Sequence, residues 1–271
     1  MERHGEQVCL DALRREIPKH CFQPHFTTTA YYIIRDLTLS VLLWTISLSI
    51  PNITSLAVRC ILWFFYGSAQ GLAFTGIWIL AHECGHNALF PSRTVNEVVG
   101  FLLHSFLLVP FYSWKYTHAR HHRFTNHMDK DTAFVPKRHG TRTWGQILVN
   151  CTRYTEDSPL VSLISLLGHQ LFGWPIYLML YVSGATSDER LAKASPYRLS
   201  HFDPWSGLFS VAQQGLVIVS DIGIMSVIYM LWKVGNRIGF GYIILWYGMP
   251  YLWVNHWIGE RAYVDAVSNT Y

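Results

Sequence analysis

Residues 61–80 read ILWFFYGSAQGLAFTGIWIL, and none of these side chains is charged. A helix that crosses the hydrocarbon core of a bilayer needs about 20 predominantly apolar residues. The whole chain of 271 residues is 51% hydrophobic and only 14% charged, whereas soluble domains carry about 25% charged residues. The stretch therefore predicts a transmembrane helix, and the composition indicates an integral membrane protein.

The charge balance and the cysteines exclude several other classes. With 21 Lys and Arg against 17 Asp and Glu, the net charge of +4 is too small for a nucleic-acid-binding protein, so we expect no nucleic-acid partner. High hydrophobicity with low charge excludes disorder. The five cysteines are odd in number and lack CxxC spacing, which indicates reduced thiols and no disulfide scaffold.

The remaining apolar stretches predict an all-α fold with about four transmembrane helices in two hairpins. Leu37–Ile50 precedes a helix that starts near Ile53 and includes the apolar stretch quoted above. Leu208–Trp232 and Ile238–Ile258 form the second hairpin, joined by the polar turn Lys233–Arg237. Asp221 falls inside this second pair of helices, where a carboxylate has either a functional role or a hydrogen-bonding partner on another helix.

Two apolar stretches do not fit a simple span. Val98–Trp114 is short and favours an in-plane or re-entrant arrangement, while Leu160–Val182 is long enough but contains Pro175 and several polar residues. Between the hairpins, Lys115–Asp157 holds more basic than acidic residues. Basic loops stay in the cytosol, so we place this stretch there together with the amino terminus.

Five of the fourteen histidines form two compact clusters. The first, HECGH, follows the apolar stretch directly, and because positions i and i+4 share one helix face, His82 and His86 can bind one metal ion. In the second, HARHH, His118 lies on the same face as His121 and His122, and this adjacent pair diverges enough to contact two ions. Neutral imidazole is the commonest protein ligand for iron, zinc and copper. Five such ligands exceed one tetrahedral site and indicate more than one metal ion.

Other readings of these histidines remain open. His82–His86 also matches the HExxH pattern of zinc proteases, in which Glu83 would be the general base. That reading leaves the second cluster unexplained, because a mononuclear hydrolase needs only three protein ligands and an open position. A third reading is a non-catalytic membrane partner. Among the histidines outside the clusters, we expect structural roles for His104, His127, His139, His169 and His201.

Motifs along nearly the whole chain resemble the membrane fatty acid desaturases, and among them the Δ12 (oleate) desaturases of fungi and plants. The motifs are IPKHCF at 17–22, HECGH at 82–86, WKYTHARHHRFTNHM at 114–128, DTAFVP at 131–136, LFGWPIYL at 171–178, SHFDPW at 200–205 and PYLWVNHW at 250–257. The resemblance implies a multi-pass enzyme of the endoplasmic reticulum with four spanning helices and a cytosolic histidine-box cap. In that layout Leu160–Val182 is peripheral to the membrane.

The resemblance also implies the chemistry. Such enzymes are non-haem di-iron oxidoreductases that hold two irons in histidine boxes, accept electrons from cytochrome b5 and use O2 to remove two hydrogens from the acyl chain of a lipid. Carried over by motif, the iron ligands are His82, His86, His118, His121 and His122. Glu83, Asp129 and Asp131 then orient box histidines, as partners of ligating histidines commonly do. The resemblance leaves the oligomeric state open.

The chain departs from the family at its carboxyl end. The family carries a third HxxHH box after the last span, whereas Ile258–Tyr271 reads IGERAYVDAVSNTY. We therefore expect a cytosolic segment at 1–36, an incomplete desaturase domain at 37–258 and an unrelated tail at 259–271. A misread gene end, an inactive regulatory remnant and a site completed by a second subunit are the alternatives. We favour the first, because the break is abrupt, and we therefore expect that the chain as written does not hold two irons at full occupancy.

Overall fold

The computed structural model describes residues 12, 15–125, 127–133, 135, 158–181, 184–185 and 199–268. All its regular elements within these ranges are helices, which confirms the all-α fold class. In the order of the chain they are η1 (Lys19–Phe22), α2 (Phe26–Ser47), η2 (Ile50–Asn52), α3 (Leu56–Gly85), α4 (Arg93–Phe106), α5 (Phe111–Phe124), α7 (Pro159–Met179), α9 (Val211–Ile238), α10 (Phe240–Ile243), the π-helical turn η4 (Ile244–Gly248) and α11 (Met249–Ser268).

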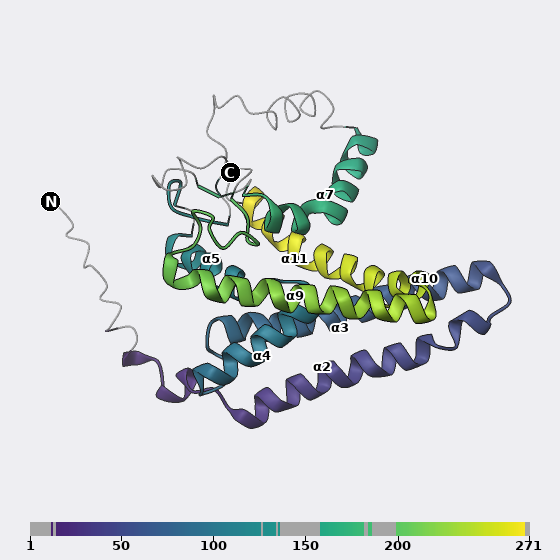
Figure 1. Cartoon of the computed structure of the whole chain (residues 1–271), viewed down its shortest axis with the longest axis horizontal. Helices are drawn as coiled ribbons and strands as arrows, with labels where there is room; N and C mark the ends of the chain where they lie inside the picture. The colour runs from purple at the N-terminus through teal and green to yellow at the C-terminus, as the bar shows by residue number, and fades with distance from the viewer. Residues whose placement is uncertain are drawn as a thin grey trace.

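Helices α2 and α3 form the first predicted hairpin (Figure 1). Helix α2 begins at Phe26, well before the apolar stretch that starts at Leu37. Helix α3 begins just after Ser55, whose hydroxyl accepts a hydrogen bond from a backbone N–H of the first turn and thereby caps the helix. Because α3 packs against α2, α4 and α11, it is the central element of the bundle.

The stretch Val98–Trp114 crosses a sharp corner between α4 and α5, whose axes meet at 108°. At this corner Leu108 has a positive φ of 55°, a left-handed conformation that branched or bulky residues rarely adopt. Pro110 follows and precedes the first turn of α5. The corner keeps the stretch from being one straight span and turns α5 back across the end of α3 (Figure 1).

The second predicted hairpin is less regular than the first. Helix α9 runs through Lys233–Arg237, so these residues form its last turns and do not make the connection. The chain turns instead at Gly239, where φ is +97°. The following helix contains a π-helical turn directly before Pro250, in keeping with the loss of one backbone donor at a proline. The residues predicted as one span, Ile238–Ile258, therefore form three successive helical elements.

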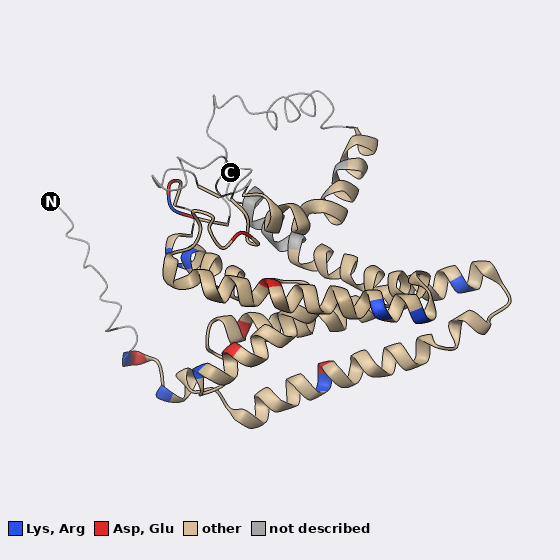
Figure 2. Cartoon of the chain, in the orientation of Figure 1, with Lys and Arg blue, Asp and Glu red and all other residues tan. Residues whose placement is uncertain are grey.

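Three helices are long and apolar enough to cross a membrane, namely α2 with the turn after it, α3 and α9. The count rises to five if the bent pairs α4–α5 and the two halves of α7 are each one span, so the prediction of about four lies within this range. Figure 2 shows that few charged residues lie along the described helices. This distribution suits a bundle embedded in lipid.

Candidate metal centre

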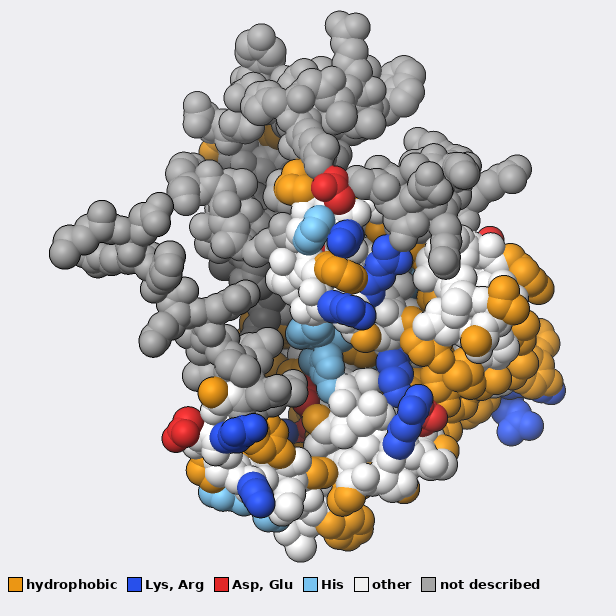
Figure 3. Space-filling view, turned by 90° about the vertical axis from the view of Figure 1, so that its left-hand side faces the viewer, with side chains coloured by type: hydrophobic (Ala, Val, Ile, Leu, Met, Phe, Trp, Pro, Cys, Tyr) orange, Lys and Arg blue, Asp and Glu red, His pale blue; other side chains and the backbone are white. Residues whose placement is uncertain are grey.

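The two predicted histidine clusters meet at one end of the bundle. His82 and His86 lie at the carboxyl end of α3, and His118 and His122 lie on α5, which packs across that end. One ring nitrogen from each of these four residues lies within 4.8 Å of the other three. Figure 3 shows histidine side chains on this face with Lys and Arg side chains around them. The arrangement joins residues that are far apart in the sequence into a single group.

The four rings present the same atom to one another. The Nε2 atoms of His118 and His82 are 2.9 Å apart, those of His118 and His122 are 3.0 Å apart, and those of His82 and His86 are 3.4 Å apart. Two nitrogens that bind one ion at about 2.1 Å are separated by about 3.0–3.4 Å for bond angles near 90–110°. The spacing of these donors therefore fits a shared metal ion.

Glu83 fixes the tautomer of one of these rings. Its Oε1 lies 3.0 Å from His82 Nδ1 and accepts the proton of that nitrogen. The Nε2 atom of His82 then presents a lone pair to the other three rings. Such a carboxylate partner is typical of metal-ligating histidines, because it orients the ring and increases its basicity.

The environment favours the neutral form of three cluster histidines. Burial and four neighbouring histidines lower the pKa of His118 to about 2. Burial also lowers the pKa of His86 and His122, with other histidines contributing in the same direction. Neutral imidazoles have lone pairs available for a cation, so these three rings are prepared for metal binding without first losing protons.

His121 is the one predicted ligand that does not join the four-ring cluster. Its Nδ1 lies 2.7 Å from Oδ1 of Asp131, a side chain that is completely buried. The Asp131 carboxylate also accepts the backbone N–H of Ala133. This contact is the one expected from the sequence, in which Asp131 orients a histidine of the second cluster. Because Nδ1 of His121 faces Asp131, Nε2 is the ring nitrogen that remains for a metal ion.

Tryptophans form the membrane-side wall of the cluster. The indole of Trp114 stacks on His118, with ring centroids 4.3 Å apart, and Trp78 stacks on His82 at 5.5 Å. Both indoles also contact the fully buried His104. This aromatic packing restricts the rotation of two cluster rings. The sequence alone did not single out these tryptophans, because their role depends on the crossing of α3, α4 and α5.

The remaining predicted residues lie outside the cluster. The ring of His127 accepts a hydrogen bond from the Asp129 backbone, and His256 on α11 packs against Trp253 and Trp257. His139 and the side chain of His169 lie outside the described part of the chain. We therefore find no further cluster member among the described histidines.

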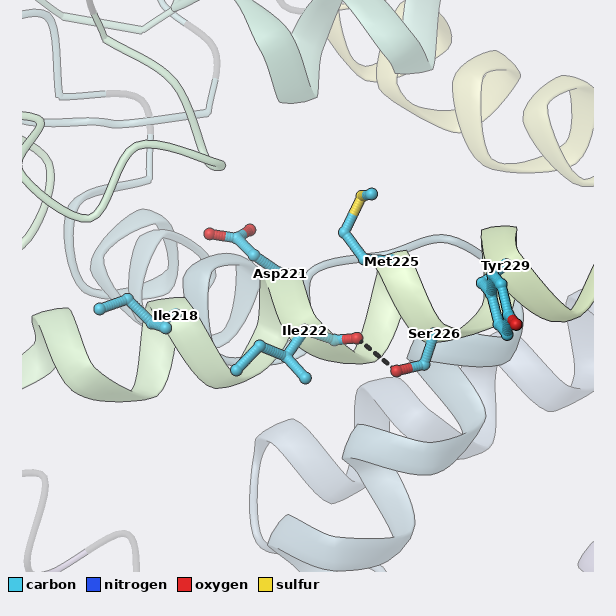
Figure 4. Close-up of a pocket in the computed structure, with 6 residues that line it drawn as sticks. All are labelled: Ile218, Asp221, Ile222, Met225, Ser226 and Tyr229. Atoms are coloured by element: carbon cyan, nitrogen blue, oxygen red, sulfur yellow. Dashed lines mark hydrogen bonds between the residues drawn. The ribbon is translucent and has the colours of Figure 1, made fainter.

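Asp221 lies on α9 beside an open, shallow hollow of about 400 Å³, and none of the cluster residues lines this hollow. Figure 4 shows the carboxylate pointing away from the α9 backbone among apolar side chains. Its Oδ1 atom is buried without a hydrogen-bond partner among the described residues. The Oδ1 atom of Asp221 therefore does not form the helix–helix hydrogen bond that was one of the two expectations from the sequence.

Comparison with known proteins agrees with the site. The profile of the fatty acid desaturase family matches residues 61–271. The chain is 36% identical over 272 residues to an oleate hydroxylase of Claviceps purpurea, which covers 95% of the chain and 57% of the relative. It is 34% identical to a Δ12-acyl-lipid desaturase of Punica granatum, covering 94% of the chain and 62% of the relative.

A third relative is an omega-6 fatty acid desaturase, endoplasmic reticulum isozyme 1, of Glycine max, which is 35% identical over 93% of the chain and 61% of the relative. The chain thus spans about three fifths of the length of these curated relatives. The match covers both histidine clusters and the helices that carry them. On this evidence, the chain belongs to the fatty acid desaturase family.

Proposed function

We propose that this chain carries the metal-binding part of an O2-dependent acyl-lipid desaturase or hydroxylase of the Δ12 type. The observation that supports this most directly is the convergence of four Nε2 atoms at the end of the spanning helix α3. A site at the end of a membrane helix lies where an acyl chain can reach it from the lipid. Relatives named as an oleate hydroxylase and as Δ12 desaturases suggest an oleoyl lipid as the substrate.

The proposed ligands are His82, His86, His118 and His122 for one ion and His121 for a second. Bound iron supplies the oxidising chemistry needed to break an unactivated C–H bond. The role of the protein is to hold neutral imidazoles in fixed orientations: Glu83 does this for His82, and Asp131 does it for His121.

We further propose cytochrome b5 as the electron donor and the endoplasmic reticulum as the location. The resemblance to the family supports both, and a relative is named as an endoplasmic reticulum isozyme. Exposed basic side chains near the cluster, such as Arg123 and Lys130, suit an acidic redox partner. The open face of the cluster, where His86 and His122 are exposed, is accessible to such a partner.

The structure gives less support to the zinc-protease alternative. A general base must be able to reach a metal-bound water, whereas the Glu83 carboxylate accepts a hydrogen bond from Nδ1 of His82. In addition, α5 supplies two ligands that a single HExxH motif does not explain. The two functions also differ in their dependence on α5, because protease activity would not need His122.

Metal titration of the purified chain in lipid nanodiscs tests the proposal. Co2+ serves as a spectroscopic probe, and Fe2+ uptake is measured by elemental analysis after desalting. We expect His118→Ala to abolish the visible Co2+ bands, because this ring has the closest contacts to two other rings. His127→Ala, on the same segment but outside the cluster, is the matched control. A chain that binds Co2+ equally well with and without His118 contradicts the proposed site.

A further inference from the structure

Helix α5 has two polar faces that lie about 100° apart around its axis. His118 and His122 form the front face, whose nitrogens enter the histidine cluster. Thr117 and His121, also four residues apart, form the back face, and each has a partner elsewhere in the chain. Because a helix turns by about 100° per residue, the position of the back face determines where the front face points.

On the back face, Thr117 lies at the centre of a buried hydrogen-bond network. Its hydroxyl is 3.1 Å from Nε2 of His201, and its backbone carbonyl accepts a 2.8 Å hydrogen bond from the Thr132 hydroxyl. All three side chains are almost completely buried. Thr132 directly follows Asp131, which binds His121. The same short segment therefore contacts α5 at two points one turn apart.

His201 connects this network to α7 and the segment that follows it. Its backbone N–H donates to the carbonyl of Leu178, and the N–H of Tyr181 donates to the carbonyl of Leu199. The ring packs 4.9 Å from that of Tyr177. Backbone carbonyls of Tyr177 and Leu178 on α7 also hydrogen-bond to the ring. Its Nε2 forms a hydrogen bond with the Thr117 hydroxyl, which in turn lies within hydrogen-bond distance of backbone carbonyls on its own helix.

The segment after α7 also reaches the other contact point. The backbone N–H of Ala185 donates to the carbonyl of Asp131 at 2.8 Å, and the hydroxyl of Tyr181 donates to the carbonyl of Ala185. One clamp, formed by Leu178–Tyr181, Ala185 and Leu199–His201, therefore supports both Thr117 and Asp131. Among the described residues, its side-chain hydrogen bond to α5 is made at Thr117 on the back face, and its apolar side chains pack against Tyr116.

We propose that His201 is a positioning residue for the second histidine cluster. Through Thr117 it fixes the rotation of α5 and thus the direction in which His118 and His122 present their nitrogens. Metal sites need ligands held within about 0.5 Å of the productive geometry, and a free helix end does not provide this. The inference rests on the proposed metal-binding function, because positioning has a purpose only if the nitrogens bind a shared ligand.

Two pairs of substitutions test the clamp by Co2+ titration in nanodiscs. His201→Phe and Thr117→Val remove the hydrogen bond while keeping a similar volume, and His201→Gln and Thr117→Ser retain a bonding group. We expect the first pair to weaken Co2+ binding about 10- to 100-fold, as is usual when a partner of a metal ligand is lost. The double substitution should add little to either single one, because both remove the same contact.

A metal-free measurement separates this inference from the proposed function. Hydrogen–deuterium exchange of the apo protein should become faster in α5 peptides of His201→Phe and stay unchanged in α3 peptides. Val217→Ala is the packing control, because Val217 is buried in the same cluster as Leu199 without joining the network. Its Co2+ affinity should stay within twofold of the unsubstituted protein.

The outcomes divide clearly. Unchanged α5 exchange in His201→Phe, or the same loss of affinity in Val217→Ala, overturns the positioning role. Additive effects of His201→Phe and Thr117→Val also contradict it. If the unsubstituted protein binds no Co2+ while His201→Phe still speeds exchange in α5, the clamp is supported and the metal-binding function is refuted.

Discussion

Replacing Gly71 by alanine tests the closest approach between α3 and α11. A Cβ atom at this position lies 2.3 Å from Cβ of Trp253 and 2.9 Å from the carbonyl oxygen of Pro250. Carbon atoms pack best about 3.5–4.0 Å apart, so the two helices must separate by more than about 1 Å. Neither contact atom is the end of a flexible side chain, and rotation of a side chain therefore cannot relieve the overlap.

The cost follows from two opposing effects. Overpacking of this kind costs about 1–3 kcal/mol, and the rigid contacts at Gly71 place it near the upper value. Alanine recovers about 1 kcal/mol relative to glycine in a helix, which leaves a net loss of about 2 kcal/mol. Gly215 on α9 is the matched control, because a Cβ there has no neighbour within 4 Å.

Thermal unfolding of the two variants in detergent provides the measurement. A loss of 1 kcal/mol lowers the midpoint by about 2–4 °C in a chain of this size, so Gly71→Ala should unfold about 4–8 °C below the unsubstituted protein. Gly215→Ala should unfold at the same temperature or higher. Equal midpoints for the two variants would refute the close packing of α3 on α11.

Three other substitutions have expected outcomes. Asn87 has a positive φ of 56° and an exposed side chain. Asn87→Gly should therefore be more stable than Asn87→Ala by about 1 kcal/mol, although alanine is usually the more stabilising of the two residues. Equal thermal midpoints of the two variants would contradict this. Asp221→Leu removes a carboxyl group from a candidate span and should raise the free energy of unfolding by up to about 3 kcal/mol, seen as a higher thermal midpoint, whereas a lower midpoint would reveal a partner for the carboxylate. Burial lowers the pKa of His201 from 6.5 to about 4, so between these pH values only the unfolded chain takes up its proton. Between pH 6.5 and about 4, the contribution of His201 to the free energy of unfolding should then fall by about 1.4 kcal/mol for each pH unit, and His201→Gln should remove that part of the slope measured by denaturant titration.

Local sequence patterns predicted much of the fold and of the centre. The uncharged stretch at 61–80 lies within α3, and the spacing of HxxxH placed His82 and His86 on one face of that helix. The second cluster was predicted to bind metal as a set. The structure divides this set, since His118 and His122 join the cluster while His121 turns to Asp131. Helical spacing alone could not make this division, because it depends on which elements pack on each side of α5.

Residues whose roles depend on distant partners were not found from the sequence. His201 was assigned a structural role, and only the fold places it next to Thr117. The turn expected at Lys233–Arg237 was also misplaced: α9 continues to Ile238, and Gly239, with a φ of +97°, makes the turn. For His201 the deciding contact is tertiary, and the local sequence carries no information about such a partner.

The length of α3 links the metal centre to the thickness of the bilayer. Its 30 residues rise about 45 Å, whereas the hydrocarbon core is about 30 Å thick. The uncharged stretch at 61–80 matches that thickness, so His82 stands in the first turn beyond it. A membrane only a few ångströms thicker would draw this turn into hydrocarbon or force the helix to change its tilt. Hydrophobic mismatch thus acts on the donor atoms themselves and favours membranes of one thickness.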